Sequence, residues 1–261
     1  MQVDTTPPTL TITSDQGFLA YEVGDRASVT IAASDAISGL ATNPSASHVP
    51  ISTAKPGRFA ITRSATDRCG NRATASFTYT VVPPPAFAVS VDVEPVSGKV
   101  RLRKGRQFVA LTEARAIPVN STIDATRGTI RLTTATSVHR QYQTGTFGGG
   151  VFNVVQQRSQ RGLVELHLID PSTRLCTPAR KAVVARLSPR VLALLHSNVH
   201  GSFRTRGRYS AATVRGTAWT IEDRCDGTLT VVTRGTVLVL DFALRRTIAV
   251  RAGQSYLARA L

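Results

Sequence analysis

The last fifty residues, 209–258, constrain the fold most strongly, because apolar and polar side chains alternate through most of them. A period of two is typical of a β-strand with one buried face. Residues 233–235 and 252–254 each contain a glycine, which favours a tight reversal of the chain. We therefore expect strands joined by short turns. The side chains expected to face inward are Leu229, Val231, Val237, Val239, Ile248 and Val250.

The composition favours an all-β fold with packed cores. Thr and Val are abundant, and both are stiff at χ1 and suit pleated strands. Hydrophobic residues make up 42% of the 261 residues, a length that predicts one or two domains. No apolar run reaches the roughly 18 residues that a membrane-spanning helix requires, so we predict no transmembrane segment in this chain.

The formal charge of +16 is unevenly distributed. Residues 1–82 contain six basic and six acidic side chains, so the rest of the chain carries the whole excess. A surface of this kind attracts polyanions such as nucleic acids, anionic lipids and acidic cell-wall polymers. The alternative is a solvated surface from an arginine-rich proteome, without a specific ligand.

A run of prolines at residues 83–85 marks a domain boundary at the point where the charge changes. Such a run forms a short semi-rigid spacer. We predict an N-terminal domain at residues 1–82, a proline-rich linker at 83–88 and a basic domain at 89–261. We expect the two domains to fold independently.

Strands are predicted in both domains, with at most one short helix. The predicted strands outside the last fifty residues are 9–14, 27–33, 57–65, 73–82, 89–93, 97–103, 107–111, 121–124, 129–134, 143–147, 151–157 and 163–168. The helix is expected within residues 178–198, where Ser188-Pro189 resembles an N-cap followed by proline at the first helical position. Three glycines at residues 148–150 are interpreted as a hairpin turn, because no lysine and helix follow as in a phosphate-binding loop.

Three motifs stand out in the N-terminal domain: residues 4–8 (DTTPP), 34–40 (SDAISGL) and 65–73 (ATDRCGNRA). The third contains an Asp-x-x-Gly-Asn turn and leads into an alternating strand. With these motifs, residues 4–82 resemble a bacterial immunoglobulin-like (Ig-like) domain of the kind strung along surface proteins. The resemblance implies a β-sandwich that spaces or adheres without catalysis. Relatives often pair two cysteines here, whereas this chain has Cys69 alone.

The basic domain contains a second set of motifs, at residues 98–100 (GKV), 117–119 (IPV), 121–125 (STIDA), 212–219 (ATVRGTAW), 235–239 (GTVLV) and 250–254 (VRAGQ). With them, residues 89–258 resemble the FecR family of extracytoplasmic β-domains, and residues 135–206 form a long insertion in the pattern. Some relatives take part in signalling across a membrane to a sigma factor. The cytoplasmic and transmembrane parts of such a signalling protein are absent from this sequence.

The three cysteines do not favour a zinc site, because no pair has Cys-x-x-Cys spacing, and their odd number leaves at least one free thiol or an intermolecular bond. Chains with the FecR-like pattern carry cysteines at the places of Cys176 and Cys225, and this resemblance implies a bond between them. Such a bond requires an oxidising compartment. Cys69 would remain a single thiol, and the alternative for the pair is two reduced, half-buried cysteines.

Two groups of residues raise the question of a metal site. His196 and His200 are four residues apart, which could place two imidazoles on one helical face, but no Glu-x-x-His accompanies them. We expect exposed loop histidines. Asp35, Asp67 and Asn71 could supply oxygen ligands for calcium, but Asp and Asn are common in turns because they bond their own backbone. We predict no metal and no cofactor.

The sequence favours a protein that is not an enzyme. No Gly-x-Ser-x-Gly or equivalent nucleophile motif is found. Glu222, Asp223 and Asp226 cluster beside Cys225, and paired acids could serve a glycosidase. An Asp- and Gly-rich hairpin tip with a salt bridge to Arg224 is the better interpretation.

Two basic segments are the best candidates for binding. Strand alternation would project every second arginine from one face, which suits phosphates or carboxylates. The predicted polyanion-binding residues are Arg101, Arg103, Lys104, Arg106, Arg204, Arg206 and Arg208. Because only 6% of residues are aromatic, stacking platforms for single-stranded nucleic acid are few. An acidic surface polymer or lipid is therefore favoured over DNA.

The sequence thus predicts a non-enzymatic secreted or cell-surface protein. The Ig-like domain would act as a spacer or adhesive module, and the basic domain would bind an acidic cell-wall polymer or another surface protein. Because residues 1–8 lack the features of a signal peptide, we expect a fragment of a longer exported chain. The alternatives are an extracytoplasmic sensor that regulates a sigma factor and, less favoured, a cytoplasmic nucleic-acid binder.

Overall fold

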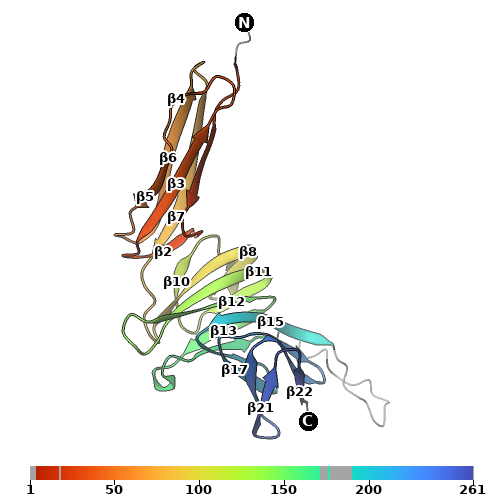
Figure 1. Cartoon of the computed structure of the whole chain (residues 1–261). Coiled ribbons are helices and arrows are strands. Elements are labelled where there is room, and N and C mark those ends of the chain that lie inside the picture. The colour runs from red at the N-terminus through yellow and green to blue at the C-terminus, as the bar shows by residue number, and fades with distance from the viewer. Residues whose placement is uncertain (1–3, 18, 171–175, 177–189, 261) are drawn as a thin grey trace. The chain divides into compact units, whose positions relative to one another are not determined.

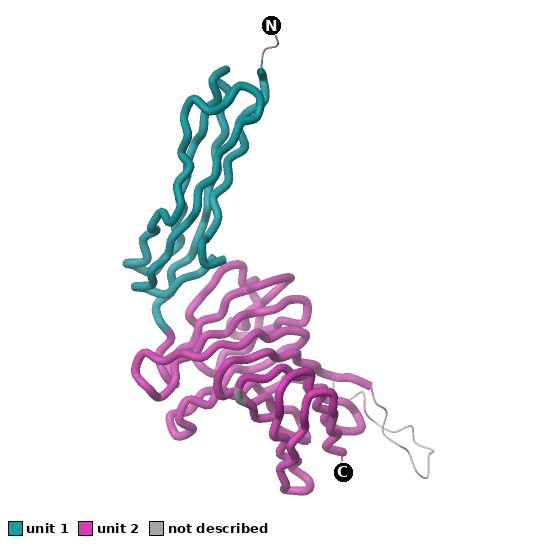
Figure 2. The backbone as a smooth tube through the Cα atoms, viewed as in Figure 1, with its two compact units in different colours: residues 1–84 teal, residues 85–261 magenta. Residues whose placement is uncertain are grey.

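The structure, a computed structural model, describes residues 4–17, 19–170, 176 and 190–260. The chain divides into two compact units, residues 1–84 and 85–261 (Figure 2), and the division falls inside the predicted linker. Within the described residues no α-helix occurs, and the helical structure is of the 3-10 type, as in the turn Arg158–Gln160. The predicted all-β fold is therefore confirmed.

The first unit is a sandwich of two sheets (Figure 1). The three-stranded sheet has the order β1 (Thr9–Ser14), β3 (Ala27–Ser34), β5 (Ala46–Ile51). The four-stranded sheet has the order β2 (Ala20–Glu22), β7 (Arg72–Val82), β6 (Gly57–Asp67), β4 (Leu40–Thr42). The core between them consists of Tyr21, Ala27, Val29, Ile31, Phe77, Tyr79 and Val81.

The alternation predicted for the last strand of this unit is confirmed. Phe77, Tyr79 and Val81 on β7 are buried, whereas Ser76 and Thr78, on the opposite face of the strand, are exposed. Tyr79 also donates its hydroxyl hydrogen to the carbonyl oxygen of residue 52 at 3.0 Å. The polar tip of a large apolar side chain is thereby satisfied inside the sandwich.

The second unit is built on one sheet of fifteen strands. Its strands are β8 (Ser90–Lys104), β9 (Gln107–Ala110), β10 (Arg115–Pro118), β11 (Thr122–Ala135), β12 (Tyr142–Gly148), β13 (Val151–Gln156), β14 (Val164–Leu168), β15 (Val191–His200), β16 (Ser202–Arg206), β17 (Ser210–Arg215), β18 (Ala218–Arg224), β19 (Gly227–Arg234), β20 (Thr236–Asp241), β21 (Arg246–Arg251) and β22 (Ser255–Arg259). The main path runs β21-β20-β17-β16-β14-β13-β11-β12-β15-β18-β19-β22. β8 lies along the other edge of β11, and it pairs with β9 and β10 as well.

This sheet curls into a nearly closed barrel. β21 and β22 stand at the two ends of the main path, yet residues 252–254 join them directly along the chain. The enclosed core contains Trp219, Phe147, Phe152 and Phe203 among its largest fully buried side chains. The predicted turns at residues 233–235 and 252–254 are both present, with Gly235 at φ +78° and Gly253 at φ +81°.

Residues 148–150 do not form the predicted hairpin turn. β12 and β13 lie one after the other along the same edge of β11, and both run antiparallel to it. Between them, Gly149 N–H donates to the Ala125 carbonyl oxygen, and Ala125 N–H donates to the Gly150 carbonyl oxygen. The glycines are needed for a different reason, because a Cβ on Gly150 would lie 1.9 Å from the Leu194 carbonyl oxygen. Gly149 and Gly150 permit close contact between this segment and β15, and Gly148 permits close contact with β11.

The short helix predicted within residues 178–198 is wrong for its described part. β15 lies between β12 and β18, with antiparallel pairing on both sides. Its buried residues Ala193, Leu195, Ser197 and Val199 recur with a period of two. The apolar cluster at 191–195 fitted a helical period as well, and the two strand partners decide the outcome. Ser188 and Pro189, the predicted helix start, lie outside the described residues.

Two further details of the prediction are corrected by these strands. His196 and His200 lie on the exposed side of β15 and not in a loop. On β19, Thr228, Thr230 and Val232 face the core in place of Leu229 and Val231. Thr228 can face the core because its hydroxyl donates to Asp223 Oδ1 and accepts the Tyr209 N–H, so its polar group is satisfied when buried. Val237, Val239 and Val250 are buried as predicted, and Ile248 packs against the core.

Candidate polyanion-binding surface

The first predicted basic segment lies on the β8–β9 hairpin. Lys99, Arg101 and Arg103 are exposed, and they alternate with buried Val100 and Leu102. The alternation therefore projects three cations from one face of β8. We call this face, together with the adjoining outer faces of β9 and β11, the basic face.

A recess of about 440 Å³ opens on the basic face, lined by Lys99, Arg101, Asp124, Thr126 and Arg127. It lies where the pairing of β8 and β11 is irregular. The register shifts between Asp124, opposite Arg101, and Arg127, opposite Lys99. A β-bulge of this kind redirects side chains, and it brings three basic side chains to one recess.

The carboxylate of Asp124 balances the positive charge of one of these side chains, Arg101. It pairs with Arg101 through Nε and Nη2 of the guanidinium, and it accepts the Thr126 N–H at 3.0 Å. Burial alone would raise the pKa of Asp124, but the hydrogen bonds from Thr126 and Arg101 outweigh it and lower the pKa. Asp124 is therefore ionised at neutral pH.

The other two cations of the recess are left without a counter-charge. Within the described residues, Lys99 and Arg127 form no ion pair with a carboxylate. They stand directly opposite each other in the β8–β11 ladder. Like charges in that position destabilise a sheet. An anion bound between Lys99 and Arg127 would relieve the repulsion, so the recess is suited to a phosphate or carboxylate.

The tip of the hairpin extends the basic face. Arg103, Lys104 and Arg106 are exposed there, and Arg103 Nε donates to the Gly105 carbonyl oxygen at 3.1 Å. The guanidinium of Arg101 lies 5.5 Å from the ring centroid of Phe108 on β9. The four residues predicted in this segment are thus brought together, while Lys99, Thr126 and Arg127 were not among the predicted site residues.

The second basic segment lies elsewhere on the sheet. Arg204 and Arg206 are on β16, and β11, β13 and β14 separate this strand from β8. Four inter-strand steps correspond to about 19 Å. The structure therefore does not bring the two predicted segments into one site.

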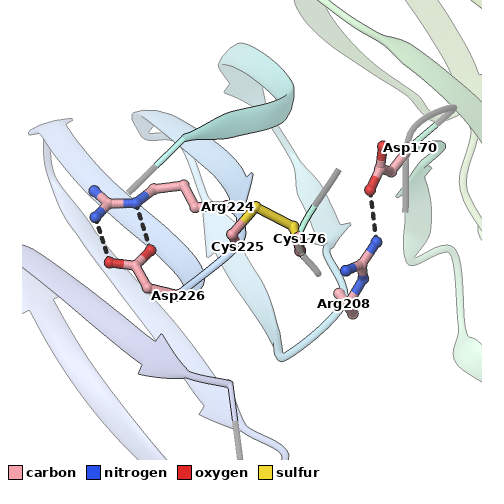
Figure 3. The surroundings of a disulfide bond; sticks show 6 residues. All are labelled: Asp170, Cys176, Arg208, Arg224, Cys225 and Asp226. Carbon is pink, nitrogen blue, oxygen red and sulfur yellow. Dashed lines mark hydrogen bonds and ion pairs between the residues drawn. A yellow bond between two sulfur atoms is a disulfide. The ribbon is translucent and has the colours of Figure 1, made fainter. Parts of the chain in front are cut away.

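Two arginines of the second segment already form ion pairs with carboxylates. Arg204 pairs with Glu165 at 2.7 Å. Arg208 pairs with Asp170 at 2.5 Å, as Figure 3 shows. The guanidinium of Arg206 lies 5.0 Å from the centroid of the Phe242 ring. Because two of its three arginines already have a carboxylate partner, this segment is the weaker candidate for binding a polyanion.

Cys176 and Cys225 form the disulfide that the resemblance implied, with a Cα–Cα distance of 5.2 Å (Figure 3). Cys69 is a free, exposed thiol in the other unit. A disulfide is consistent with an oxidising compartment.

The acidic residues beside Cys225 do not all lie on one side, because successive side chains of β18 point to opposite faces. Glu222 and Asp223 point to opposite faces, and Asp223 is buried with a pKa that burial raises above its ordinary value. Asp226 forms a bidentate pair with Arg224 at 2.8 and 2.6 Å, the salt bridge expected at this hairpin tip (Figure 3). Glu222 and Asp223 thus do not form a pair of acids on one face.

Glu165 gives the barrel a pH-dependent part of its stability. Its buried carboxylate binds Arg204, His167 and Gln160. Burial alone would raise the pKa of Glu165, but the hydrogen bond with His167 and the charge of Arg204 outweigh it and lower the pKa. A lowered pKa in the folded state stabilises the fold above the unfolded pKa of about 4.3, and this contribution is lost as the pH falls through the folded value.

We expect Glu165→Gln to lower the free energy of unfolding most at neutral pH, with a deficit that shrinks below about pH 4. Urea denaturation between pH 3 and pH 7 measures the difference between wild type and variant. Glu113→Gln is the control, since Glu113 has no ion pair within the described residues. A deficit for Glu165→Gln that stayed constant with pH would contradict this role.

No protein family, curated protein or solved structure matches the chain. Within the described residues, none of the helical structure is long and apolar enough to cross a membrane.

Proposed function

We propose that this is a non-enzymatic polyanion-binding protein of the cell surface or the secreted fraction. The N-terminal sandwich serves as a spacer or adhesive module, and the basic domain binds an acidic polymer through the basic face. The observation that carries the proposal is the recess in which Lys99 and Arg127 stand opposite each other without a carboxylate partner among the described residues.

A polymer fits this face better than a single small anion. Lys99, Arg101 and Arg103 follow one another on the same side of β8, and alternate residues of a strand are about 7 Å apart. The row continues to the exposed Lys104 and Arg106 at the hairpin tip. A chain of repeated phosphates or carboxylates can contact several of these cations at once, which raises affinity through multiple weak contacts.

The chemistry of the face favours a surface polymer over nucleic acid. Phe108 is an aromatic side chain on the hairpin, and Arg101 already lies over its ring. Base stacking on that ring is therefore poorly supported. The Cys176–Cys225 bond supports an oxidising location, where wall polymers and anionic lipid head groups are the abundant polyanions.

We expect Lys99→Gln combined with Arg127→Gln to weaken polyanion binding about tenfold or more, since each cation near an anionic surface contributes roughly 1 kcal/mol. The ion pair of Arg101 and Asp124 is left intact in this variant. Calorimetric titration of the full chain with polyglycerol-phosphate teichoic acid, phosphatidylglycerol vesicles and duplex DNA measures the affinities at low salt.

The matched control for this experiment is Arg245→Gln combined with Arg251→Gln, which removes the same charge from exposed positions on or beside β21. It should leave the affinity nearly unchanged. Absence of binding at low ionic strength to all three polyanions would overturn the proposal. An equal loss in both double variants would assign binding to net charge and not to the recess.

A further inference from the structure

Three carboxylates of the N-terminal unit meet at one place. Asp4 precedes β1, Asp35 follows β3, and Asp67 ends β6. One carboxylate oxygen from each residue lies within 4.8 Å of the other two. Segments far apart in the sequence thus bring three acidic side chains together.

Two of these carboxylates are buried, since Asp67 is 1% exposed and Asp4 is 7% exposed. Asp4 Oδ1 accepts the Thr6 N–H at 2.9 Å. Asp4 Oδ2 is fully buried and has no hydrogen-bond partner within the described residues. An unsatisfied carboxylate oxygen is costly in the interior, and folded proteins seldom leave one without a partner. This oxygen therefore indicates a ligand.

The other two carboxylates are held in place by neutral donors. Asp35 Oδ1 accepts the N–H groups of Ser38 and Gly39 at 2.9 and 2.7 Å. Asp67 Oδ1 accepts the Asn71 N–H at 2.8 Å, and Asp67 Oδ2 accepts from Asn71 Nδ2 at 2.7 Å. These bonds fix the orientation of the carboxylates without supplying a positive charge.

The cluster has no cationic partner within the described residues, where none of the three aspartates forms an ion pair. Neighbouring carboxylates repel one another in the folded state, so a cation among them would stabilise the unit.

We infer that Asp4, Asp35 and Asp67 form a calcium-binding site. All three donors are carboxylate oxygens, which hard cations prefer, and the group contains no His or Cys that would favour zinc. Carboxylates on separate segments of the chain suit the variable geometry of calcium better than the strict octahedron of magnesium. The site does not depend on the proposed polyanion binding, which concerns the other unit.

The site differs from the alternative considered from the sequence. That alternative grouped Asp35 and Asp67 with Asn71, and we predicted no metal. In the structure the Asn71 amide donates to Asp67 and to the main-chain oxygen of Asp4, so it positions two ligands instead of binding the ion. Asp4 takes its place, and the ion would fasten the segment before β1 to the ends of β3 and β6.

Calcium titration of the full chain, freed of metal with EDTA, tests this inference by calorimetry and thermal unfolding. We expect one Ca²⁺ per chain, with a dissociation constant of about 1 mM or tighter, a higher melting temperature of the N-terminal unit, and a smaller response to Mg²⁺. Because the chain carries a net charge of +16, unspecific attraction of cations is disfavoured.

Asp4→Asn and Asp35→Asn are each expected to weaken Ca²⁺ binding at least tenfold. Asparagine keeps an oxygen acceptor for the loop hydrogen bonds, and Asp35 is only partly buried, so the unit should still fold. Asp25→Asn, a carboxylate of the same unit outside the cluster, should bind Ca²⁺ like wild type. No heat and no thermal shift in wild type at millimolar Ca²⁺ would overturn the inference, as would equal weakening by Asp25→Asn.

Discussion

Replacing Cys176 and Cys225 with serine is expected to lower the free energy of unfolding of the basic domain by about 4 kcal/mol. The bond spans a sequence separation of 49 residues. Without it the unfolded chain regains the conformations that a loop of this length forbids, whereas the folded sheet keeps its strand pairing. The loss is large compared with the typical stability of a single domain.

Urea denaturation followed by the fluorescence of Trp219 measures this change. Trp219 is the single tryptophan of the chain and lies in the core of the barrel, so the signal reports on that unit. Cys69→Ser, which removes the free thiol of the other unit, is the control and should leave the transition unchanged. A double serine variant with the midpoint and slope of wild type would show that the bond does not contribute.

Trp219→Ala is expected to lower the free energy of unfolding by about 3–5 kcal/mol. The side chain is 1% exposed, and its Nε1–H donates to the Thr205 hydroxyl at 2.9 Å. Thr205 is itself fully buried. Truncation therefore leaves both a cavity and an unpaired hydroxyl.

Trp219→Phe separates the two effects, because it keeps most of the apolar volume and removes the donor. We expect it to cost about 1–3 kcal/mol, and adding Thr205→Val should recover part of that loss. Far-UV circular dichroism replaces fluorescence for these variants. If Trp219→Ala cost no more than Trp219→Phe, the packing role of the indole would be wrong.

Local alternation of apolar and polar residues predicted the longer strands of the first unit well, whereas β8 and β11 of the second unit were each predicted as two shorter strands. β1, β3, β6 and β7 were expected within a few residues of their bounds, because each shows a period of two within its own sequence. β2 and β4 have three residues each, too few to show a period. β15 contains an apolar cluster whose spacing fits both a helix and a strand. Its pairing with β12 and β18 decides that this segment is a strand.

The residues of the two candidate sites could likewise be predicted only where a local sequence pattern points to them. The cations of the β8–β9 hairpin were predictable, because strand alternation places them on one face. Arg127 reaches the recess through the register shift between β8 and β11, and Asp4 reaches Asp67 through the closure of the sandwich. Contacts between distant segments leave no local pattern, so the sequence alone could not assign either residue.

The salt dependence of polyanion binding tests the central claim most directly. The logarithm of the association constant for teichoic acid would be plotted against the logarithm of salt concentration for wild type and for the two double variants. Each cation that contacts a phosphate contributes about one unit of slope. We predict that the Lys99→Gln, Arg127→Gln variant has a slope smaller by about two units, and that the Arg245→Gln, Arg251→Gln variant keeps the wild-type slope. Equal slopes for wild type and both variants would contradict binding at the recess.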